Sequence, residues 1–340
     1  MSVNKNSFIN KGGFVLEQFK ILFTDTIHKD LNIEKRIVED AGGELLFGAD
    51  KTEEEFFKLV EEADAIVTVY REINEEILLK AKRCKGVVRT GIGFNNIDLA
   101  KAGELGKYVC NVPDYCFDEV SDHAIISGLA IGRKLLQWDK RVKSGAWNHD
   151  GMQPIYAYQD QTFGLLGFGN IPRYVAKKVK AFGFNVIASD PYVTKEVADE
   201  YGVTLVSQDE LFAQSDYLSL HAPLTEETKY TVSKESIKKM KDGVIIINTA
   251  RGPLINEKDL YEALISGKIA GAALDVMEVE PPNMSNPLLK LDNVIITPHA
   301  AFYSEKSGIE LRRKSFEEAV KIATGLVPKN IVNKRYLVNK

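Results

Sequence analysis

The strongest constraint on this fold is a short glycine-rich turn between a predicted strand and a predicted helix. The strand starts at Phe163, the turn contains Gly167 and Gly169, and Val175 and Val179 recur at helical spacing. Glycine at the first position permits a tight turn, and glycine at the second lets the backbone approach a phosphate at the helix start. A chain with this turn is expected to build a parallel, doubly wound sheet.

Strands and helices alternate along most of the chain. Before the turn, strands are predicted at 19–23, 65–69, 86–90 and 107–110, with helices from about His28 and Asn74. Seven later strands are predicted near Phe163, Asn185, Val203, Tyr217, Gly243, Ala270 and Asn293. Because parallel strands need helical crossovers, the pattern predicts an α/β fold whose second part is a Rossmann-type doubly wound sheet.

Two further helices set the predicted domain limits. The segment from Asp118 to Asp139 is predicted as one connecting helix with Asp118 as its N-cap. A last helix, from about Ser304 to Thr324, has no strand after it, so we expect it to return to the first domain. The prediction is a discontinuous domain of residues 19–120 and 305–340 around an inserted domain of 121–304, with 1–18 as an N-terminal extension.

Composition narrows the class of protein. The 340 residues carry 44 Lys plus Arg against 48 Asp plus Glu, a formal charge of −4 without a basic stripe, so no nucleic-acid partner is expected. Cys84, Cys110 and Cys116 follow neither a disulfide framework nor a metal-site spacing. The sequence shows no apolar run of membrane-span length and no signal peptide. We therefore expect a cytoplasmic protein with reduced thiols, no metal and no membrane partner.

Asp190 adds a second feature to the glycine turn, because it ends the next strand about 20 residues after Gly169. A carboxylate there can accept hydrogen bonds from the ribose of a dinucleotide and would repel the 2′-phosphate of NADP, which favours NAD. Asn170 and Ile171 start the helix whose N–H groups would face the pyrophosphate. Pro172 replaces the usual third glycine, and its missing N–H costs little in a first turn. The alternatives are an ordinary strand-to-helix turn and a turn-forming Asp-Pro pair.

Three later strand ends carry the polar residues Arg251, Glu280 and His299. Carboxyl ends of parallel strands meet at one crevice, so these side chains are expected to converge. Arginine matches a carboxylate, and histidine transfers protons near neutral pH. A glutamate on the imidazole would fix its tautomer and raise its pKa. The set fits reduction of a 2-keto acid; the alternatives are a surface ion pair, a loop charge and a strand-capping histidine.

At these residues the chain resembles the D-isomer-specific 2-hydroxyacid dehydrogenase family, over about residues 19–325. The matching motifs are Asn248–Gly252, Asp275–Pro281, Thr297–His299 and His221–Thr225. The resemblance implies that Arg251 orients the substrate, that His299 is the acid/base and that Glu280 is its partner. It also implies that Asp275 binds the nicotinamide carboxamide. Further NAD contacts are expected from Ala222, Pro223, Thr228, Thr249 and Ala250, with Arg251 and His299 bordering the cofactor.

The segment Arg89–Asp98 resembles the family's substrate loop. The resemblance implies that the N–H groups of Gly91, Ile92 and Gly93 hold the substrate carboxylate, with Arg89 beside them; Asn95 stands where an aspartate is usual. It further implies a flavodoxin-like substrate domain that closes over the NAD domain. A homodimer through the NAD domain is also expected, helped by the helix near Asp118 and the loop around Trp147.

The leading hypothesis is an NAD-dependent dehydrogenase of a small D-2-hydroxy acid, and two alternatives stay open. Phosphoglycerate dehydrogenase is one, because Arg89 and Arg71 could meet a phosphate unless they are surface arginines. The other is an NAD(H)-sensing scaffold, since residues 90–113 and 181–192 resemble the transcriptional C-terminal-binding proteins. The chain ends at Lys340, soon after the last predicted helix, so we expect neither a regulatory domain nor a long tail.

Overall fold

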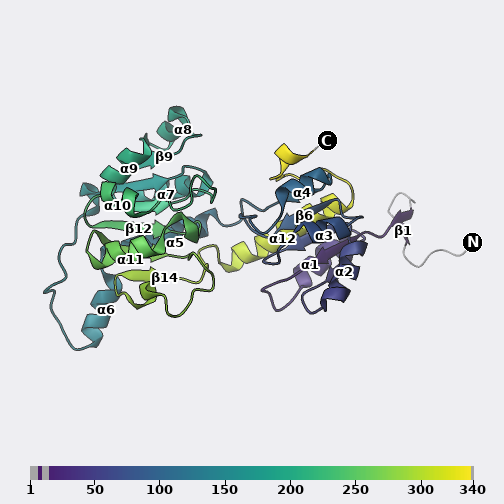
Figure 1. Ribbon diagram of the computed structural model, residues 1–340, viewed down its shortest axis with the longest axis horizontal. Coiled ribbons are helices and arrows are strands. Elements are labelled where there is room, and N and C mark those ends of the chain that lie inside the picture. The colour runs from purple at the N-terminus through teal and green to yellow at the C-terminus, as the bar shows by residue number, and fades with distance from the viewer. Residues whose placement is uncertain (1–6, 10–14, 338–340) are drawn as a thin grey trace, which may run out of the picture. The chain divides into compact units, whose positions relative to one another are not determined.

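The computed structural model describes residues 7–9 and 15–337, which divide into two compact units (Figure 1). The first unit contains the chain up to Tyr115 and from Ser304 onward, and the second contains Cys116–Tyr303. The two units therefore divide between Tyr115 and Cys116 and between Tyr303 and Ser304, whereas the predicted domain limits are 120 and 305. Residues 338–340 of the predicted first domain lie outside the described ranges. Within those ranges, no helix is long and apolar enough to cross a membrane.

The first unit has a five-stranded parallel sheet in the order β4-β3-β5-β6-β7, the flavodoxin-like order. Its strands are β3 (Lys20–Phe23), β4 (Glu44–Phe47), β5 (Ala65–Thr68), β6 (Gly86–Arg89) and β7 (Tyr108–Cys110). Its helices are α1 (Asn32–Asp40), α2 (Glu53–Glu62), α3 (Glu75–Lys80), α4 (Leu99–Glu104) and α12 (Glu305–Ala323). Successive strand residues pack on opposite faces: Leu22 joins the core under α2 and α3, and Ile21 joins the core under α1 and α12.

Both ends of the chain add to this unit. The predicted N-terminal extension contains two short strands, β1 (Ser7–Ile9) and β2 (Val15–Glu17), which pair antiparallel. Near the other end, Ile331 forms an antiparallel bridge with Cys110 of β7. The side chain of the buried Asn333 accepts the N–H of Val109 at its Oδ1 atom and donates from Nδ2 to the Lys107 carbonyl, both at 2.9 Å. These are the two kinds of hydrogen bond that a neighbouring strand would make with β7. These contacts cover the edge of the sheet.

The second unit has a seven-stranded parallel sheet in the order β10-β9-β8-β11-β12-β13-β14. Its strands are β8 (Thr162–Leu166), β9 (Asn185–Ser189), β10 (Thr204–Leu205), β11 (Tyr217–Leu220), β12 (Val244–Asn248), β13 (Ile269–Leu274) and β14 (Val294–Ile296). Its helices are α5 (Phe117–Gly132), α6 (Leu135–Lys143), α7 (Asn170–Lys180), α8 (Lys195–Glu200), α9 (Gln208–Gln214), α10 (Lys234–Lys239) and α11 (Glu257–Ile265). The order reverses beside the first strand, β8, so the predicted Rossmann-type doubly wound sheet is confirmed.

The prediction of one connecting helix from Asp118 to Asp139 is wrong. The segment forms two helices, α5 and α6, because Lys134 takes a left-handed backbone conformation with φ of 53° and interrupts the helical path. The residue before the first turn of α5 is Cys116, and Asp118 lies within that turn. There the Asp118 carboxylate accepts from Lys178 Nζ of α7 at 3.0 Å, which joins the two helices.

A buried ion pair fixes the C-terminal helix to the first unit. Arg312 of α12 donates from Nε and Nη2 to the two carboxylate oxygens of Glu34 on α1, both at 2.6 Å. Arg312 Nη2 also donates to the Asp30 carbonyl at 2.8 Å. The Glu34 side chain is fully buried and that of Arg312 is 9% exposed. Figure 1 shows α12 among the helices and strands of this unit.

We expect Arg312→Met to lower the free energy of unfolding by about 3–5 kcal/mol, because it leaves the Glu34 charge buried without its partner. The double variant Glu34→Met with Arg312→Met should recover part of that loss, since it buries no lone charge. Urea denaturation followed by circular dichroism measures both. The neighbouring Arg313 pairs with Glu310 and Glu317 at the surface, so Arg313→Met should cost about 1 kcal/mol or less. Equal losses for the two single variants would contradict the role given to Arg312.

Candidate active site

The glycine turn adopts the geometry that its sequence predicts. Gly167 follows β8 with φ of +89°, and a Cβ there would lie 3.1 Å from the backbone of His221 and Ala222. Gly169 precedes α7, and no atom lies within 4 Å of the position that its Cβ would occupy. Pro172 is the third residue of α7, where its missing N–H removes no helical hydrogen bond. The turn therefore excludes a side chain at the first glycine and leaves open space at the second.

Asp190 makes two backbone contacts that the sequence does not predict. One carboxylate oxygen accepts the N–H of Phe168, inside the glycine turn, at 2.7 Å, and the other accepts the N–H of Tyr192 at 2.8 Å. These bonds fix the turn against the end of β9. Each carboxylate oxygen can still accept a further hydrogen bond, so the side chain remains able to bind a ribose hydroxyl.

Several of the other predicted cofactor residues follow β11 and β12 in the same sheet. Thr228 donates its hydroxyl to the Pro223 carbonyl at 2.6 Å, which closes the turn after Ala222. Thr249 follows β12, and its Oγ1 atom is buried without a hydrogen-bond partner. A buried hydroxyl without a partner suits a bound polar ligand. Together with the open space at Gly169 and the N-terminus of α7, these residues fit a dinucleotide.

Arg251, Glu280 and His299 follow three neighbouring strands, β12, β13 and β14. His299 Nδ1 lies 2.6 Å from Glu280 Oε2, and Glu280 Oε1 accepts the Met277 N–H at 3.0 Å. Because a carboxylate only accepts, Nδ1 carries the proton and Nε2 is left for another partner. Both side chains are partly exposed, 43% for His299 and 36% for Glu280.

The electrostatics of Glu280 favour its charged form. Burial alone would raise the pKa of its carboxyl group, but the hydrogen bond and charge of His299, the Met277 N–H and the nearby Arg251 guanidinium outweigh it and lower that pKa. The carboxylate therefore stays ionised beside the imidazole. An ionised partner is what a histidine needs when it carries a proton for transfer.

Asn248 shapes the turn that carries Arg251. Its side chain is fully buried, donates from Nδ2 to the Arg251 carbonyl at 2.8 Å and accepts the Ala250 N–H at 3.0 Å. Gly252 follows, and any Cβ there would overlap the Met277 carbonyl. Asn248 belongs to one of the matching sequence motifs, but its role in this turn was not predicted. The sequence feature that could have indicated this role is the polar Asn248 side chain at the end of an otherwise apolar strand.

Asp275 holds the segment that carries His299. It is buried, and its Oδ1 accepts the Thr297 hydroxyl at 2.6 Å and the Ala300 N–H at 2.9 Å, while Oδ2 accepts the Ala301 N–H at 2.9 Å. The His299 N–H donates to the Asp275 carbonyl at 2.8 Å. This positioning role was not foreseen, and the predicted contact with nicotinamide stays a prediction.

Two glutamates hold the loop that carries Glu280. Glu257, at the start of α11, accepts the Glu278 N–H at 2.6 Å, and Glu278 accepts the Glu257 N–H at 2.7 Å. The Tyr230 hydroxyl also donates to Glu278 at 3.2 Å. The pairing of Glu257 with Glu278 was not predicted, because the two residues are 21 positions apart and no local sequence pattern links them.

The predicted substrate loop lies in the first unit, after β6. Gly91 has φ of +141°, and any Cβ there would overlap the Arg89 guanidinium. The Gly91 N–H, one of the three amides predicted to bind the substrate carboxylate, donates to the Arg89 carbonyl at 3.0 Å. The predicted roles of Ile92 and Gly93 stay predictions. Asn95 is exposed, whereas the neighbouring Asn96 donates to the Val69 and Arg71 carbonyls.

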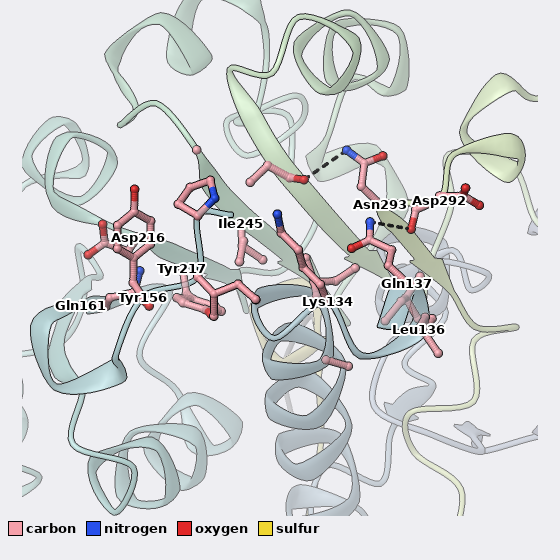
Figure 2. A pocket seen from close by; sticks show the side chains of 18 of the residues that line it. Lys134, Leu136, Gln137, Tyr156, Gln161, Asp216, Tyr217, Ile245, Asp292 and Asn293 are labelled. Atoms are coloured by element: carbon pink, nitrogen blue, oxygen red, sulfur yellow. Dashed lines mark hydrogen bonds between the residues drawn. The ribbon is translucent and has the colours of Figure 1, made fainter. Parts of the chain in front are cut away.

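A separate cavity of about 420 Å³ opens at the amino ends of the strands of the second unit (Figure 2). Gln161, Asp216 and Asn293, which border it, stand at or just before the starts of β8, β11 and β14. The catalytic candidates follow the opposite ends of the strands, so this cavity is not their site.

Among the described residues, no group of three or more His, Cys, Asp or Glu side chains could hold a metal ion.

Comparison with known proteins assigns the second unit a class. Residues 125–301 match the family model of the D-isomer specific 2-hydroxyacid dehydrogenase, NAD binding domain. A D-3-phosphoglycerate dehydrogenase of Methanocaldococcus jannaschii is 40% identical over 92% of this chain, and a hydroxypyruvate reductase of Thermotoga maritima is 42% identical over 78% of it and 88% of its own length. The crystal structure of a D-lactate dehydrogenase from Aquifex aeolicus, complexed with NAD and lactic acid, superposes with a TM-score of 0.81 at 31% identity, covering 90% of this chain and 96% of that one.

The overlap with the phosphoglycerate dehydrogenases is partial. The chain spans 59% of the length of the Methanocaldococcus relative and 53% of that of a D-3-phosphoglycerate dehydrogenase from Archaeoglobus fulgidus.

His221, beside the glycine turn, yields a test of this geometry. Burial lowers its pKa to about 3, and its Nε2 lies 2.8 Å from Ser219 Oγ. An unfolded chain protonates histidine near pH 6.5, so between about pH 6.5 and 3 the unfolded state binds more protons. The stability from this neutral ring is complete above that window and is lost as the pH falls through it.

We therefore expect the unfolding free energy to fall more steeply from pH 7.5 to 5 in the wild type than in His221→Gln, as measured by urea denaturation. His149→Gln, at an exposed histidine, should keep the wild-type slope. Equal slopes for wild type and His221→Gln would show that the ring is protonated in the folded state.

Proposed function

The chain belongs to the D-isomer specific 2-hydroxyacid dehydrogenase family, and on that premise we propose that it transfers a hydride between NAD(H) and C2 of a small D-2-hydroxy acid or 2-keto acid. The observation that carries the proposal is the 2.6 Å contact of His299 Nδ1 with Glu280 Oε2, with Arg251 close enough to lower the pKa of that glutamate. A cation for the substrate carboxylate and a proton donor for its oxygen are what keto-acid reduction requires.

We assign the cofactor site to residues at the carboxyl ends of the strands. Asp190 would accept the ribose hydroxyls, and its negative charge opposes the 2′-phosphate of NADP. Bound NADH supplies the hydride that reaches C2. The N–H groups at the start of α7 would receive the pyrophosphate, with the other contacts from Gly167, Gly169, Asn170, Ile171, Ala222, Pro223, Thr228, Thr249, Ala250, Asp275 and His299.

In the proposed reduction, Arg251 holds the substrate carboxylate and polarises the C2 carbonyl. His299 donates the Nε2 proton to the carbonyl oxygen as hydride arrives at C2, so the product is the neutral hydroxyl group. Glu280 keeps the Nδ1 proton hydrogen-bonded and stabilises the protonated ring before the transfer. In the oxidation direction the same ring accepts the proton.

The substrate itself is less constrained than the chemistry. In the first unit we propose Arg89, Ile92 and Gly93 as substrate contacts, with Gly91 contributing after its N–H leaves the Arg89 carbonyl. Phosphoglycerate dehydrogenase is the second candidate, because the Methanocaldococcus relative with that name is 40% identical. Arg71, the other proposed phosphate ligand, has its guanidinium 4.0 Å from the centre of the Phe56 ring.

We expect the purified protein to oxidise NADH with at least one of glyoxylate, hydroxypyruvate, pyruvate, a longer 2-keto acid or 3-phosphohydroxypyruvate. Arg251→Ala and His299→Ala should each lower kcat/KM by about 10²–10⁴-fold, because one removes substrate orientation and the other the proton donor. Steady-state absorbance assays give kcat/KM, and NADH fluorescence gives the Kd.

The control is cofactor binding, which we expect both variants to retain because the glycine turn and Asp190 are unchanged and His299→Ala removes only one of the proposed cofactor contacts. Substantial activity in either variant would contradict its assigned role. No turnover by the wild type with any of these acids, together with NADH binding, would favour the NAD(H)-sensing scaffold instead.

We also propose that two copies pair through the second unit. Helix α6 contains no buried residue, and its apolar Leu135, Leu136 and Val142 are 55%, 56% and 45% exposed. Trp147, just after it, is 88% exposed, and Tyr156 at the cavity of Figure 2 is 61% exposed. An apolar surface of this kind is typical of a protein interface.

We also propose a cytoplasmic location. The three cysteines are buried free thiols and form no disulfide framework, which fits a reducing compartment.

We expect the wild type to sediment as a dimer. Trp147→Asp should raise the Kd for dissociation of the dimer at least tenfold, because the substitution would bury a charge in the interface. Analytical ultracentrifugation over a concentration series measures this. Leu326→Asp, at a 62% exposed site of the first unit, is the matched control and should leave the Kd unchanged. A monomeric wild type would contradict the pairing.

A further inference from the structure

A chain of hydrogen bonds connects helix α5 to the catalytic histidine. His123 of α5 places its Nε2 atom 2.9 Å from the Thr297 hydroxyl, and that hydroxyl lies 2.6 Å from Asp275 Oδ1. Asp275 accepts the N–H groups of Ala300 and Ala301 from its side chain and that of His299 from its carbonyl. His123 therefore reaches the backbone of His299 through Thr297 and Asp275, and its Nε2 atom also lies 3.8 Å from Asp275 Oδ1.

The directions of these bonds follow from the carboxylate. Asp275 Oδ1 can only accept, so the Thr297 hydroxyl donates to it and has lone pairs left for His123. His123 Nε2 must then carry the proton and donate it to Thr297. The protonated Nε2 of His123 thus orients the hydroxyl toward Asp275.

The backbone conformation of His299 has to be held in place by hydrogen bonds from its surroundings. Its φ is +51°, a left-handed conformation that side-chain-bearing residues rarely adopt. The surrounding structure must impose a conformation of this kind. Here the imposing groups are the carbonyl and both carboxylate oxygens of Asp275, one of which also accepts from the Thr297 hydroxyl, and the Thr297 carbonyl, which shares the His299 N–H at 3.0 Å.

We propose that His123 is a positioning residue for the reaction: by donating to Thr297 it orients the Asp275 carboxylate, which holds His299 in its left-handed conformation with Nε2 toward the substrate. The inference rests on the proposed role of His299 as acid/base. His123 does not contact the reacting atoms, so its effect falls on the placement of His299.

The position of His123 allows the role to be tested without unfolding the protein. Its side chain is 27% exposed, and the neighbouring Ala124 and Ile125 supply the buried apolar face of α5. Lys178 of α7 additionally bonds to Asp118, Ser121 and Asp122 of α5. Helix α5 therefore keeps its packing when His123 is replaced.

The kinetic arm compares His123→Leu with His123→Gln. Leucine removes the donor, so we expect kcat to fall by about 10- to 100-fold, with the Kd for NADH within about threefold of wild type. Glutamine can place an amide N–H where Nε2 lies and should recover most of kcat. Ile126→Leu, at an exposed site of the same helix, is the matched control. A wild-type kcat in His123→Leu, or a glutamine variant as impaired as the leucine variant, would overturn the proposal.

The second arm needs no turnover. The chain has five histidines, so ¹⁵N-histidine labelling gives a ring NMR spectrum that can be assigned by variants. We expect the neutral His123 ring to be protonated at Nε2, and the His299 ring signals to shift in His123→Leu and Thr297→Val but to stay in place in Thr297→Ser. An Nδ1–H form of His123, or unchanged His299 signals in both disruptive variants, would overturn the inference. If the wild type shows no turnover, the proposed function fails and this arm alone decides whether His123 positions His299.

Discussion

Parallel pairing of β12, β13 and β14 is the constraint on which the candidate site depends. The strands run in one direction and end at one edge of the sheet, so the segments that carry Arg251, Glu280 and His299 leave the sheet side by side. The pairing of β12 with β13 has one register irregularity, at the start of β12, and a further shift toward the carboxyl ends would move the three segments apart. Strand β12 is buried along its whole length, and its polar last residue, Asn248, bonds to the turn that follows, which fixes where the strand ends.

Polar side chains at the strand ends, buried for Asn248 and Asp275 and half-buried for Asp190, then hold the loops that form the candidate site. Asn248 forms the turn before Arg251, Asp275 holds the segment around His299, and Asp190 closes the glycine turn. Each accepts backbone N–H groups that would otherwise lack a partner at the point where the strand stops. Because a buried amide or carboxylate is costly without such partners, the turns have few other conformations. The first unit uses the same device, where Asp25 accepts the N–H groups of Val69, Tyr70 and Arg71.

The sequence predicted the regular part of this architecture well, for a local reason. Apolar runs of strand length and apolar residues at helical spacing record which side of each element is buried. Strand β4 was missed because it is four residues long, lies at the edge of its sheet and has only one buried position. The break between α5 and α6 was missed because Lys134 carries no turn signature, although it adopts a left-handed conformation.

By itself, the sequence determined the two parallel α/β units, the glycine turn and the three residue types that follow the last strands. These are properties of residue order and spacing. The family resemblance implied that Glu280 is the partner of His299, but only the tertiary structure decided that Nδ1 is the atom that meets it. The tertiary structure alone also decided that Glu257 and Glu278 hold the loop that carries Glu280, and that His123 reaches Asp275 through Thr297. The physical reason is that a hydrogen bond joins atoms within about 3 Å, and residues far apart along a chain come that close only after the sheet has set their positions.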